Sequence, residues 1–379
     1  MNINRKINVL VIPDLFPKFE GDVQGIFILD YLTSTNARCN NTVLFGRLTS
    51  DKKGLSIEKN DHYQLYRFSI SSKKVPSFLK PFYYVLWFLK GFKTGKQFKD
   101  IDIIHAHGSI LSGTLSYLLS KKLKIPFIIT EHQGPFTMTS ENFWKRNWTK
   151  YIMQKADAVL AVSNHLKQEI LDTHIHPKQI YVTHNPVNTQ LFKLKSNHLF
   201  KNMLFVGRLD NFKGALRCVI AFEKIHLLLP NWTFTIVGDG EDYKPIESYL
   251  KNNKALQKKI FLKGKLSKVE IADEMQRSDF LVLPSKHESF GLVIAEALSS
   301  GLPVIVGNKT APKEFVNHEN GLLIPSYDIN ELAKSMEVMI NSLSLFDAQC
   351  IRQKIIENFG FENFEKKITN IYQSIINKY

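Results

Sequence analysis

The stretch "FLVLPSKHESFGLVIAEALSSGLPVIVGN" (residues 280–308) contains a complete strand–helix–strand pattern. Its first apolar run, 280–285, predicts a buried strand, and a polar loop follows it. The largely apolar run 291–300 predicts a helix that stops at Gly301. A second apolar run, 302–308, predicts the next strand. A helix that joins two buried strands is typical of a parallel sheet.

The same alternation extends through the chain in both directions. Further β-branched, apolar runs that predict strands lie at 7–14, 41–46, 102–108, 126–132, 158–163, 179–185, 202–208, 232–240, 259–264 and 321–325. Amphipathic patterns that predict helices lie at 109–122, 164–172, 213–229, 242–254, 268–277, 330–341, 347–357 and 362–377. We therefore expect an α/β protein with two Rossmann-like domains, each a doubly wound parallel sheet.

The alternation of strand and helix patterns is interrupted by the polar stretch 187–200, which predicts the boundary between the two domains. We expect an N-terminal domain over 1–190 and a C-terminal domain over 191–359. A length of 379 residues suits two domains of ordinary size. Ligands of open α/β sheets bind at the carboxyl ends of the strands, so chemistry is expected there and in a cleft between the domains.

The net charge of +15 is concentrated in the first half of the chain, where residues 1–192 carry +11 of it. A basic half predicts an anionic partner, either a membrane, a nucleic acid or a phosphorylated substrate. The sequence contains no nucleic-acid recognition motif, so we expect no specific nucleic-acid binding. The three cysteines are far apart and suit a reducing compartment. We find no 18-residue apolar stretch and no signal peptide, and expect a cytoplasmic protein.

Two glutamates stand out in the opening stretch. Glu288 lies in the loop, and Glu296 lies among apolar residues within the predicted helix. An unpaired buried carboxylate is costly, so Glu296 is expected to bind a ligand through paired hydroxyl groups. The alternative is that Glu288 is solvated and that Glu296 extends its carboxylate to the surface.

Backbone N–H groups lie between these carboxylates. Those of Phe290, Gly291 and Leu292 belong to the N-terminus of the predicted helix, where an anion is stabilised. Two cations, Arg208 and Lys213, follow the first strand of the second domain in "FVGRLDNFKG" (205–214). Because both loops reach the same sheet edge, we expect a diphosphate site between the cations and the helix terminus.

These motifs carry a family resemblance. "VGRLDNFKG", "IVGDGED", "KGKLSKVE" and "LPSKHESFGLVIAEALSSGLPVIV" resemble the C-terminal half of retaining nucleotide-sugar glycosyltransferases of family 4, which have the GT-B fold. The motifs that carry this resemblance are concentrated in residues 202–326. The first half matches through the shorter motifs "DIIHAHGS", "TEHQGPF" and "AVSNHLK". The resemblance also implies that the final helix, 360–379, packs back on the N-terminal domain.

The resemblance implies a role for each donor-site residue. Arg208 and Lys213 would bind the donor diphosphate, Glu296 the ribose hydroxyls, and Glu288 the transferred sugar. The amides of Phe290, Gly291 and Leu292 would contact the sugar and phosphate. Gly238 and the segment Lys265–Leu266 would border the base.

The first domain supplies three further candidates. The resemblance places His132 near the transferred sugar, and the alternative is a structural histidine at a strand end. His105 and His107 form an H-x-H pair that suggests a metal, although a structural role is favoured because no third ligand is evident. The loop 16–27 contains Gly21 and Gly25 and is expected to approach the donor phosphates.

Arg208, Lys213 and the helix terminus would stabilise the charge on the leaving diphosphate. We therefore expect no metal requirement and no bound cofactor, the nucleoside-diphosphate sugar being a co-substrate. The resemblance implies retention of anomeric configuration, with attack on the face that the diphosphate leaves. The leaving phosphate would assist deprotonation of the acceptor.

Residues 73–99 contain seven lysines, eight aromatic residues and no acid. A helix over 79–92 is expected to lie on an anionic membrane. The alternative is an ordinary helix that covers the sheet of the N-terminal domain and exposes its lysines to solvent. A membrane-facing acceptor domain suggests a lipid-linked glycan acceptor, at the inner face of the cell membrane. We expect a hexosyltransferase of bacterial-type capsule, exopolysaccharide or lipopolysaccharide synthesis. The alternatives are a GT-B epimerase or phosphorylase, or a non-catalytic sugar-nucleotide-binding membrane protein.

Overall fold

The structure is a computed structural model of the whole chain. It describes residues 5–18, 24–49, 54–71, 100–134, 143–196, 198–325 and 327–379, together with the single positions 22, 76, 79, 83, 85, 88 and 136. The chain forms two compact units. The first contains 1–186 and 361–379, and the second contains 187–360. Each unit is described on its own below.

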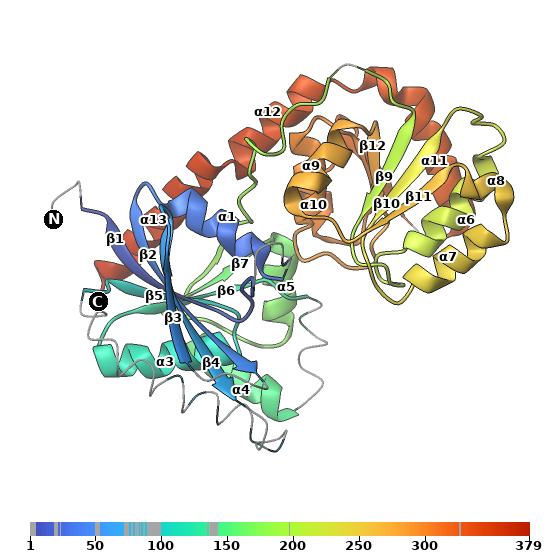
Figure 1. Ribbon diagram of the computed structural model, residues 1–379. Helices are drawn as coiled ribbons and strands as arrows, with labels where there is room; N and C mark the ends of the chain where they lie inside the picture. The colour runs from blue at the N-terminus through green and yellow to red at the C-terminus, as the bar shows by residue number, and fades with distance from the viewer. Residues whose placement is uncertain are drawn as a thin grey trace. The chain divides into compact units, whose positions relative to one another are not determined.

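The first unit is built on an eight-stranded sheet in the order β3-β4-β2-β1-β5-β6-β7-β8 (Figure 1). The strands are β1 (Ile7–Pro13), β2 (Cys39–Thr49), β3 (Gly54–Lys59), β4 (Tyr63–Ser71), β5 (Ile103–His107), β6 (Phe127–Glu131), β7 (Ala158–Ala161) and β8 (Ile180–Val182). All neighbours pair in parallel except β3 and β4, which are antiparallel. The strand order reverses between β1 and β5, which makes their carboxyl ends the switch point of this sheet.

Helices cover both faces of this sheet. They are α1 (Ile26–Thr35), α3 (Leu111–Leu123), α4 (Phe143–Lys155), α5 (Asn164–Asp172) and α13 (Phe361–Ile376). Alternate residues of β1, Val9 and Val11, share one core with Ile28 of α1 and with Ile368 and Tyr372 of α13. In Figure 1, α1 and α13 lie on one face of the sheet, and α3 and α4 lie on the other. The last helix of the chain therefore completes the core of the first unit.

The second unit is built on a six-stranded sheet in the order β11-β10-β9-β12-β13-β14, with all neighbours parallel. The strands are β9 (Asn202–Val206), β10 (Thr233–Val237), β11 (Ile260–Gly264), β12 (Phe280–Leu283), β13 (Val304–Gly307) and β14 (Gly321–Ile324). The helices are α6 (Ala215–Ile225), α7 (Tyr243–Lys251), α8 (Lys254–Gln257), α9 (Lys268–Gln276), α10 (Leu292–Ser299), α11 (Ile329–Ser342) and α12 (Ala348–Phe359). The strand order reverses between β9 and β12, so a ligand site is expected where these two strands end.

The α/β class and the two doubly wound sheets are confirmed, but the sequence pattern missed several elements of the first unit. The antiparallel edge strand β3 was not predicted, and all six of its residues are exposed, so it lacks the buried apolar signal of the other strands. Its partner β4 and the helices α1 and α4 were missed as well. Helix α4 is polar on average and carries exposed aromatic residues, which hides its amphipathic period.

No helix in the described part of the chain has the length and apolar character needed to cross a bilayer. The segment 73–99 that the sequence assigns to a membrane surface lies almost wholly outside the described residues, as does Gly21 of the predicted glycine loop.

Candidate functional site

Two loops of the second unit bring a cation and a carboxylate together. Lys213 follows β9 and Glu288 follows β12, the two strands that flank the switch point. The Lys213 Nζ lies 2.5 Å from the Glu288 Oε1. Both side chains are mostly buried, with 24% and 10% of their surface exposed. The contact shows that the loops after β9 and β12 reach one point of the sheet edge, as the sequence predicts.

The loop after β9 is shaped by Asp210. One of its carboxylate oxygens accepts a hydrogen bond from the Lys213 backbone N–H at 2.8 Å, and the other pairs with the Arg208 guanidinium. Arg208 remains 69% exposed, so its remaining N–H groups are accessible to a ligand. Sequence reasoning did not single out Asp210. Its position within "GRLD", directly after the first strand of the second domain, is the sequence feature that could have identified it.

Helix α10 begins at this same edge. Gly291 is its N-cap and has a left-handed backbone, with φ of 88°. A Cβ added there would lie 2.8 Å from the Pro312 Cγ, so a larger residue is excluded by both space and conformation. Phe290 packs its ring in the core against Phe315 and Phe359, with centroids 5.4 and 5.3 Å away. Because its ring is packed in the core, Phe290 can offer a ligand only its backbone groups. The neighbouring backbone groups of Gly291 and of the first helical residue, Leu292, lie beside them.

Glu296 lies in the second turn of α10 and is buried, with 6% of its surface exposed. Its carboxylate pairs with the Lys268 ammonium at 3.0 Å, and Lys268 is the first residue of α9. Burial rules out the alternative of a surface glutamate. Lys268 was missed as a site residue although "KGKLSKVE" was singled out, because nothing local connects it to Glu296.

Gly238 lies where β9, β10 and β11 end side by side. Its φ is 143°, and an added Cβ would lie 1.9 Å from the Gly207 carbonyl oxygen. Its N–H donates to the Gly264 carbonyl oxygen at 2.8 Å. Lys265 and Leu266 follow β11 directly, Lys265 being exposed and Leu266 partly buried. The structure thus places the three residues predicted to border the base at the edge that also carries Arg208.

The carboxyl edge of the first sheet carries a row of histidines. His107 ends β5 and His132 follows β6, and the His107 Nδ1 lies 2.9 Å from the His132 Nε2. Desolvation by burial lowers the pKa of His132 to about 3, and that of His107 falls well below its usual range for the same reason. Both rings are therefore neutral near pH 7, and one donates its proton to the other. His132 can exchange a hydrogen bond with a ligand but does not supply a positive charge.

His105 belongs to a structural network. Its Nδ1 lies 2.6 Å from the Tyr372 hydroxyl and its Nε2 lies 2.6 Å from the Thr130 hydroxyl, and the Tyr372 hydroxyl also contacts that of Tyr31. Burial lowers the pKa of His105 to about 3. With both ring nitrogens hydrogen-bonded, His105 is not available to a metal, which supports the structural interpretation of the H-x-H pair.

Asp14 marks the switch point of the first sheet and was not predicted. It follows β1, and its Oδ1 accepts hydrogen bonds from the backbone N–H and the hydroxyl of Ser112 at 2.8 and 2.5 Å. An added Cβ at Gly108 would lie 2.0 Å from the Asp14 Oδ2, so the carboxyl group fills the space over this glycine. Burial raises the pKa of the Asp14 carboxyl. Its position directly after the first predicted strand is the sequence feature that could have identified Asp14 as a candidate site residue.

Gly25 is the N-cap of α1 and has a φ of 73°. An added Cβ would lie 2.5 Å from the Leu15 carbonyl carbon, so the loop after β1 turns closely against itself here. The first turn of α1 contains no acid. The N-terminus of α1 is therefore suited to binding an anion. The contacts of Gly25 itself indicate a role in the conformation of the loop.

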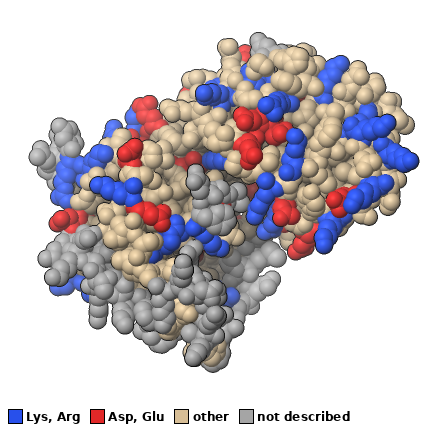
Figure 2. Space-filling view, in the orientation of Figure 1, with Lys and Arg blue, Asp and Glu red and all other residues tan. Residues whose placement is uncertain are grey.

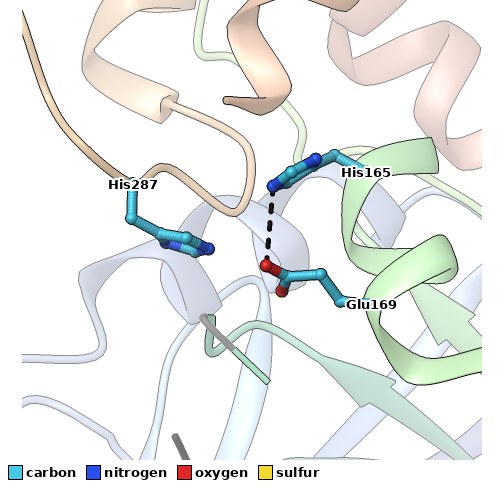
Figure 3. Close-up of side chains that lie close together, drawn as sticks. All are labelled: His165, Glu169 and His287. Atoms are coloured by element: carbon cyan, nitrogen blue, oxygen red, sulfur yellow. Dashed lines mark ion pairs between the residues drawn. The ribbon is translucent and has the colours of Figure 1, made fainter. Parts of the chain in front are cut away.

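His165 and Glu169, one turn apart on α5, form an ion pair at 3.5 Å when His165 is protonated (Figure 3). Glu169 also accepts a hydrogen bond from the Phe136 backbone N–H at 3.0 Å, which ties α5 to the chain after β6. His287, also drawn there, lies in the loop after β12 of the second unit, next to Glu288.

Two family models match this chain. Glycosyl transferases group 1 matches residues 187–355, and Glycosyltransferase Family 4 matches residues 45–191. Together they cover most of both units.

Relatives and solved structures agree with these matches. An uncharacterised glycosyltransferase of Methanocaldococcus jannaschii is 32% identical over 308 residues, covering 78% of this chain and 83% of the relative. The Escherichia coli UDP-Gal:alpha-D-GlcNAc-diphosphoundecaprenol alpha-1,3-galactosyltransferase is 28% identical over 302 residues, covering 73% and 76%. The Anabaena protein Alr3699/HepE, solved in complex with UDP, shares the fold, with a TM-score of 0.75, 16% identity and coverage of 97% and 100%. The chain belongs to the family 4 glycosyltransferases (glycosyl transferases group 1), with the two Rossmann-like units of the GT-B fold.

Proposed function

We propose that this glycosyltransferase moves a hexose from a nucleoside-diphosphate sugar to a lipid-linked glycan acceptor, with retention of anomeric configuration and without a metal. The observation that carries the proposal is the convergence of Arg208, Lys213, Glu288 and the N-terminus of α10 at the switch point of the second sheet. Cations and helix N–H groups suit a diphosphate, and an adjacent carboxylate suits sugar hydroxyls.

Charge development in the reaction explains this arrangement. When the bond from the sugar to the diphosphate breaks, negative charge grows on the leaving group and positive charge on the sugar ring. Lys213, Arg208 and the α10 N-terminus stabilise the leaving diphosphate, and they are held in place before the reaction. Lys213 is already paired with Glu288. A bound diphosphate would compete for that lysine, leaving Glu288 free to accept a sugar hydroxyl.

The remaining roles follow the family resemblance. The buried Glu296 would accept hydrogen bonds from the ribose hydroxyls, with its carboxylate held in place by the ion pair to Lys268. Gly238, Lys265 and Leu266 would border the base. The acceptor would attack on the face from which the diphosphate leaves, and the diphosphate would assist its deprotonation. His132, neutral near pH 7, would bond a sugar hydroxyl, and Gly25 would let the first-unit loop approach the phosphates.

Similar proteins support the choice of substrates. The name of the Escherichia coli relative specifies a UDP-galactose donor and a diphosphoundecaprenol-linked acceptor, and HepE was solved with UDP. We therefore place UDP-sugars first among donors, and a polyprenyl-diphosphate glycan of cell-surface polysaccharide synthesis first among acceptors. The basic aromatic segment 73–99 would hold the enzyme at the inner face of the membrane that carries such an acceptor.

A donor screen tests the proposal. Thermal shift and hydrolysis would be measured with UDP-, GDP-, ADP- and dTDP-sugars, first without metal and then with magnesium. We expect one nucleotide family to stabilise the protein without metal. Lys213→Ala and Glu296→Ala should each weaken that binding by about tenfold or more, because each removes a charged hydrogen-bonding partner of the donor.

The matched control is Lys263→Ala, which removes a lysine from β11 that pairs with Glu274. Donor affinity should remain at the wild-type value in this variant. An absence of stabilisation by every nucleotide sugar would contradict the proposal, and a strict magnesium requirement would contradict its metal-independent part.

A further inference from the structure

Helix α4 exposes a group of aromatic side chains at the surface of the first unit. Its inner side, formed by Thr149, Ile152 and Met153, is buried. Its outer side nevertheless carries four aromatic residues with 39–79% of their surface exposed, namely Phe143, Trp144, Trp148 and Tyr151. A surface helix normally has a polar outer side, and a cluster of exposed apolar groups marks an interaction site. We call these four residues, with the cations of α4 and the neighbouring Tyr117 and Lys121 of α3, the α4 face.

The aromatic side chains form a fixed platform. The rings of Trp148 and Tyr151 stack with centroids 5.5 Å apart, and the Tyr151 and Tyr117 hydroxyls lie 3.1 Å apart. The Trp148 indole N–H donates to the Thr114 hydroxyl at 2.8 Å. Trp144, Trp148 and Tyr151 follow each other at intervals of four and three residues, so they form one stripe along the helix. A fixed stripe of tryptophan and tyrosine has an apolar body and polar edges, which suits the boundary between lipid and water.

The charges around the platform have one sign. Helix α4 carries Lys145, Arg146, Lys150 and Lys155, and α3 carries Lys121 and Lys122; neither helix contains an Asp or a Glu. Several of the cations lie over the rings. The Arg146 Cζ is 5.7 Å from the Phe143 centroid, and the Lys155 Nζ is 5.3 Å from that of Tyr151. By contrast, on the side of the second unit drawn in Figure 2, basic and acidic residues are intermixed.

We propose that the α4 face docks on the surface of an anionic lipid bilayer. Tryptophan and tyrosine would enter the headgroup region, and the flanking lysines and Arg146 would contact lipid phosphates. A protein partner is less suited to the face, because protein interfaces are depleted in lysine. The proposal concerns described residues separate from the segment 73–99. It does not depend on the identity of the donor or acceptor.

The test uses the full chain with vesicles of phosphatidylcholine, with or without phosphatidylglycerol, and without any donor or acceptor. We expect co-sedimentation with the anionic vesicles that weakens with salt. The aromatic variant Phe143→Ser/Trp144→Ser and the charge variant Lys145→Gln/Arg146→Gln/Lys150→Gln should each lower the partition coefficient by roughly tenfold or more.

Matched controls lie on the second unit. Leu227→Ser/Leu228→Ser removes two residues that are 81% and 69% exposed, and Lys244→Gln/Lys254→Gln/Lys258→Gln removes three exposed lysines. Both should leave partition within about twofold of wild type, since neither changes a residue of the α4 face. Brominated phosphatidylcholine should quench tryptophan fluorescence, and the quenching should diminish in Trp144→Phe/Trp148→Phe.

Three outcomes would overturn the proposal. The first is unchanged partition in both α4 variants. The second is loss of binding only in Lys73→Gln/Lys74→Gln/Lys80→Gln, which would assign the membrane contact to 73–99 alone. The third is a concentration-dependent oligomer in wild type, without vesicles, that the α4 variants abolish, because the face would then bind protein. Donor hydrolysis in solution should be unchanged in the α4 variants, which separates failure here from failure of the proposed glycosyl transfer.

Discussion

At the scale of single residues, the buried pair of Lys268 and Glu296 shows how a charge is kept inside an apolar helix. Glu296 lies among apolar neighbours on α10, yet its carboxylate has a cation 3.0 Å away on α9. Removing one member of a buried ion pair is more destabilising than removing both, because the remaining charge loses its compensation. The pair therefore has a structural role in addition to the donor contact proposed for Glu296.

A mutant cycle at this pair separates the two roles. We expect Lys268→Met to lower the free energy of unfolding by about 3 kcal/mol, because it leaves the Glu296 carboxylate without its cation. The double variant Lys268→Met/Glu296→Leu should recover part of that loss. Urea unfolding of wild type, both single variants and the double variant gives the coupling energy.

If the double variant were destabilised by the sum of the two single effects, the pair would contribute no coupling. Nucleotide binding should be lost in the double variant even where stability returns, because the proposed ribose contact is absent.

At the scale of secondary-structure elements, a polar network holds β5, β6, α1 and α13 together inside the first unit. His105 on β5 contacts Thr130 on β6 and Tyr372 on α13, and Tyr372 contacts Tyr31 on α1. Such a network is stable only while each member keeps the protonation state that its hydrogen bonds require. Because burial lowers the pKa of His105 to about 3, the ring is neutral in the folded protein over the whole physiological range.

This pKa predicts a dependence of stability on pH. Between the ordinary histidine pKa of 6.5 and the folded value of about 3, the unfolded chain binds the proton and the folded chain does not. The free energy of unfolding should therefore fall as pH falls through that window, by up to about 1.4 kcal/mol per pH unit for this residue. The variant His105→Gln should show a shallower pH slope than wild type by that amount.

Urea unfolding at several pH values from 8 down to 4 measures the two slopes. At pH 8 the difference between the two proteins gives the cost of the altered network alone. Asp14 and Glu131 have pKa values raised by burial and oppose the histidine contribution in both proteins, so their effect cancels in the comparison. Parallel slopes would show that His105 is not held neutral.

At the scale of the whole molecule, the chain leaves the first unit at residue 186 and returns to it at residue 361. The returning helix α13 contributes Phe364, Ile368, Tyr372 and Ile375 to the core that β1 and α1 share. The first unit is therefore incomplete until the last residues of the chain are present. Folding of the first unit depends on a contact between the two ends of the sequence, which has a high loop-closure cost.

A single substitution in α13 should consequently weaken the first unit. Tyr372 is fully buried, and we expect Tyr372→Ala to destabilise this unit by about 4 kcal/mol through the cavity and the lost hydrogen bonds. Hydrogen exchange followed by mass spectrometry should show faster exchange in β1 and β5 and unchanged exchange in β9–β14.

The matched control is Tyr379→Ala, because Tyr379 is 66% exposed. Exchange in this control should equal that of wild type. Faster exchange throughout 187–360 in the Tyr372 variant would show that the two units do not unfold independently.

The sequence by itself determined what depends on near neighbours along the chain. Alternating strand and helix periods predicted two doubly wound sheets, and residues at strand ends predicted that Arg208, Lys213, Glu288 and Gly291 share one sheet edge. This prediction is possible because the carboxyl ends of parallel strands lie at the same edge of their sheet, independently of the rest of the fold. The family motifs pointed to the same residues, and the family is now established.

The tertiary structure alone decided what depends on distant residues. It paired Glu296 with Lys268, joined His107 to His132, placed Tyr372 in the core of the first unit and added the antiparallel strand β3 at its sheet edge. It also left the aromatic side of α4 exposed. A periodic pattern indicates that a side chain is apolar, but packing between distant segments determines how far it is covered, and the aromatic residues of α4 remain 39–79% exposed.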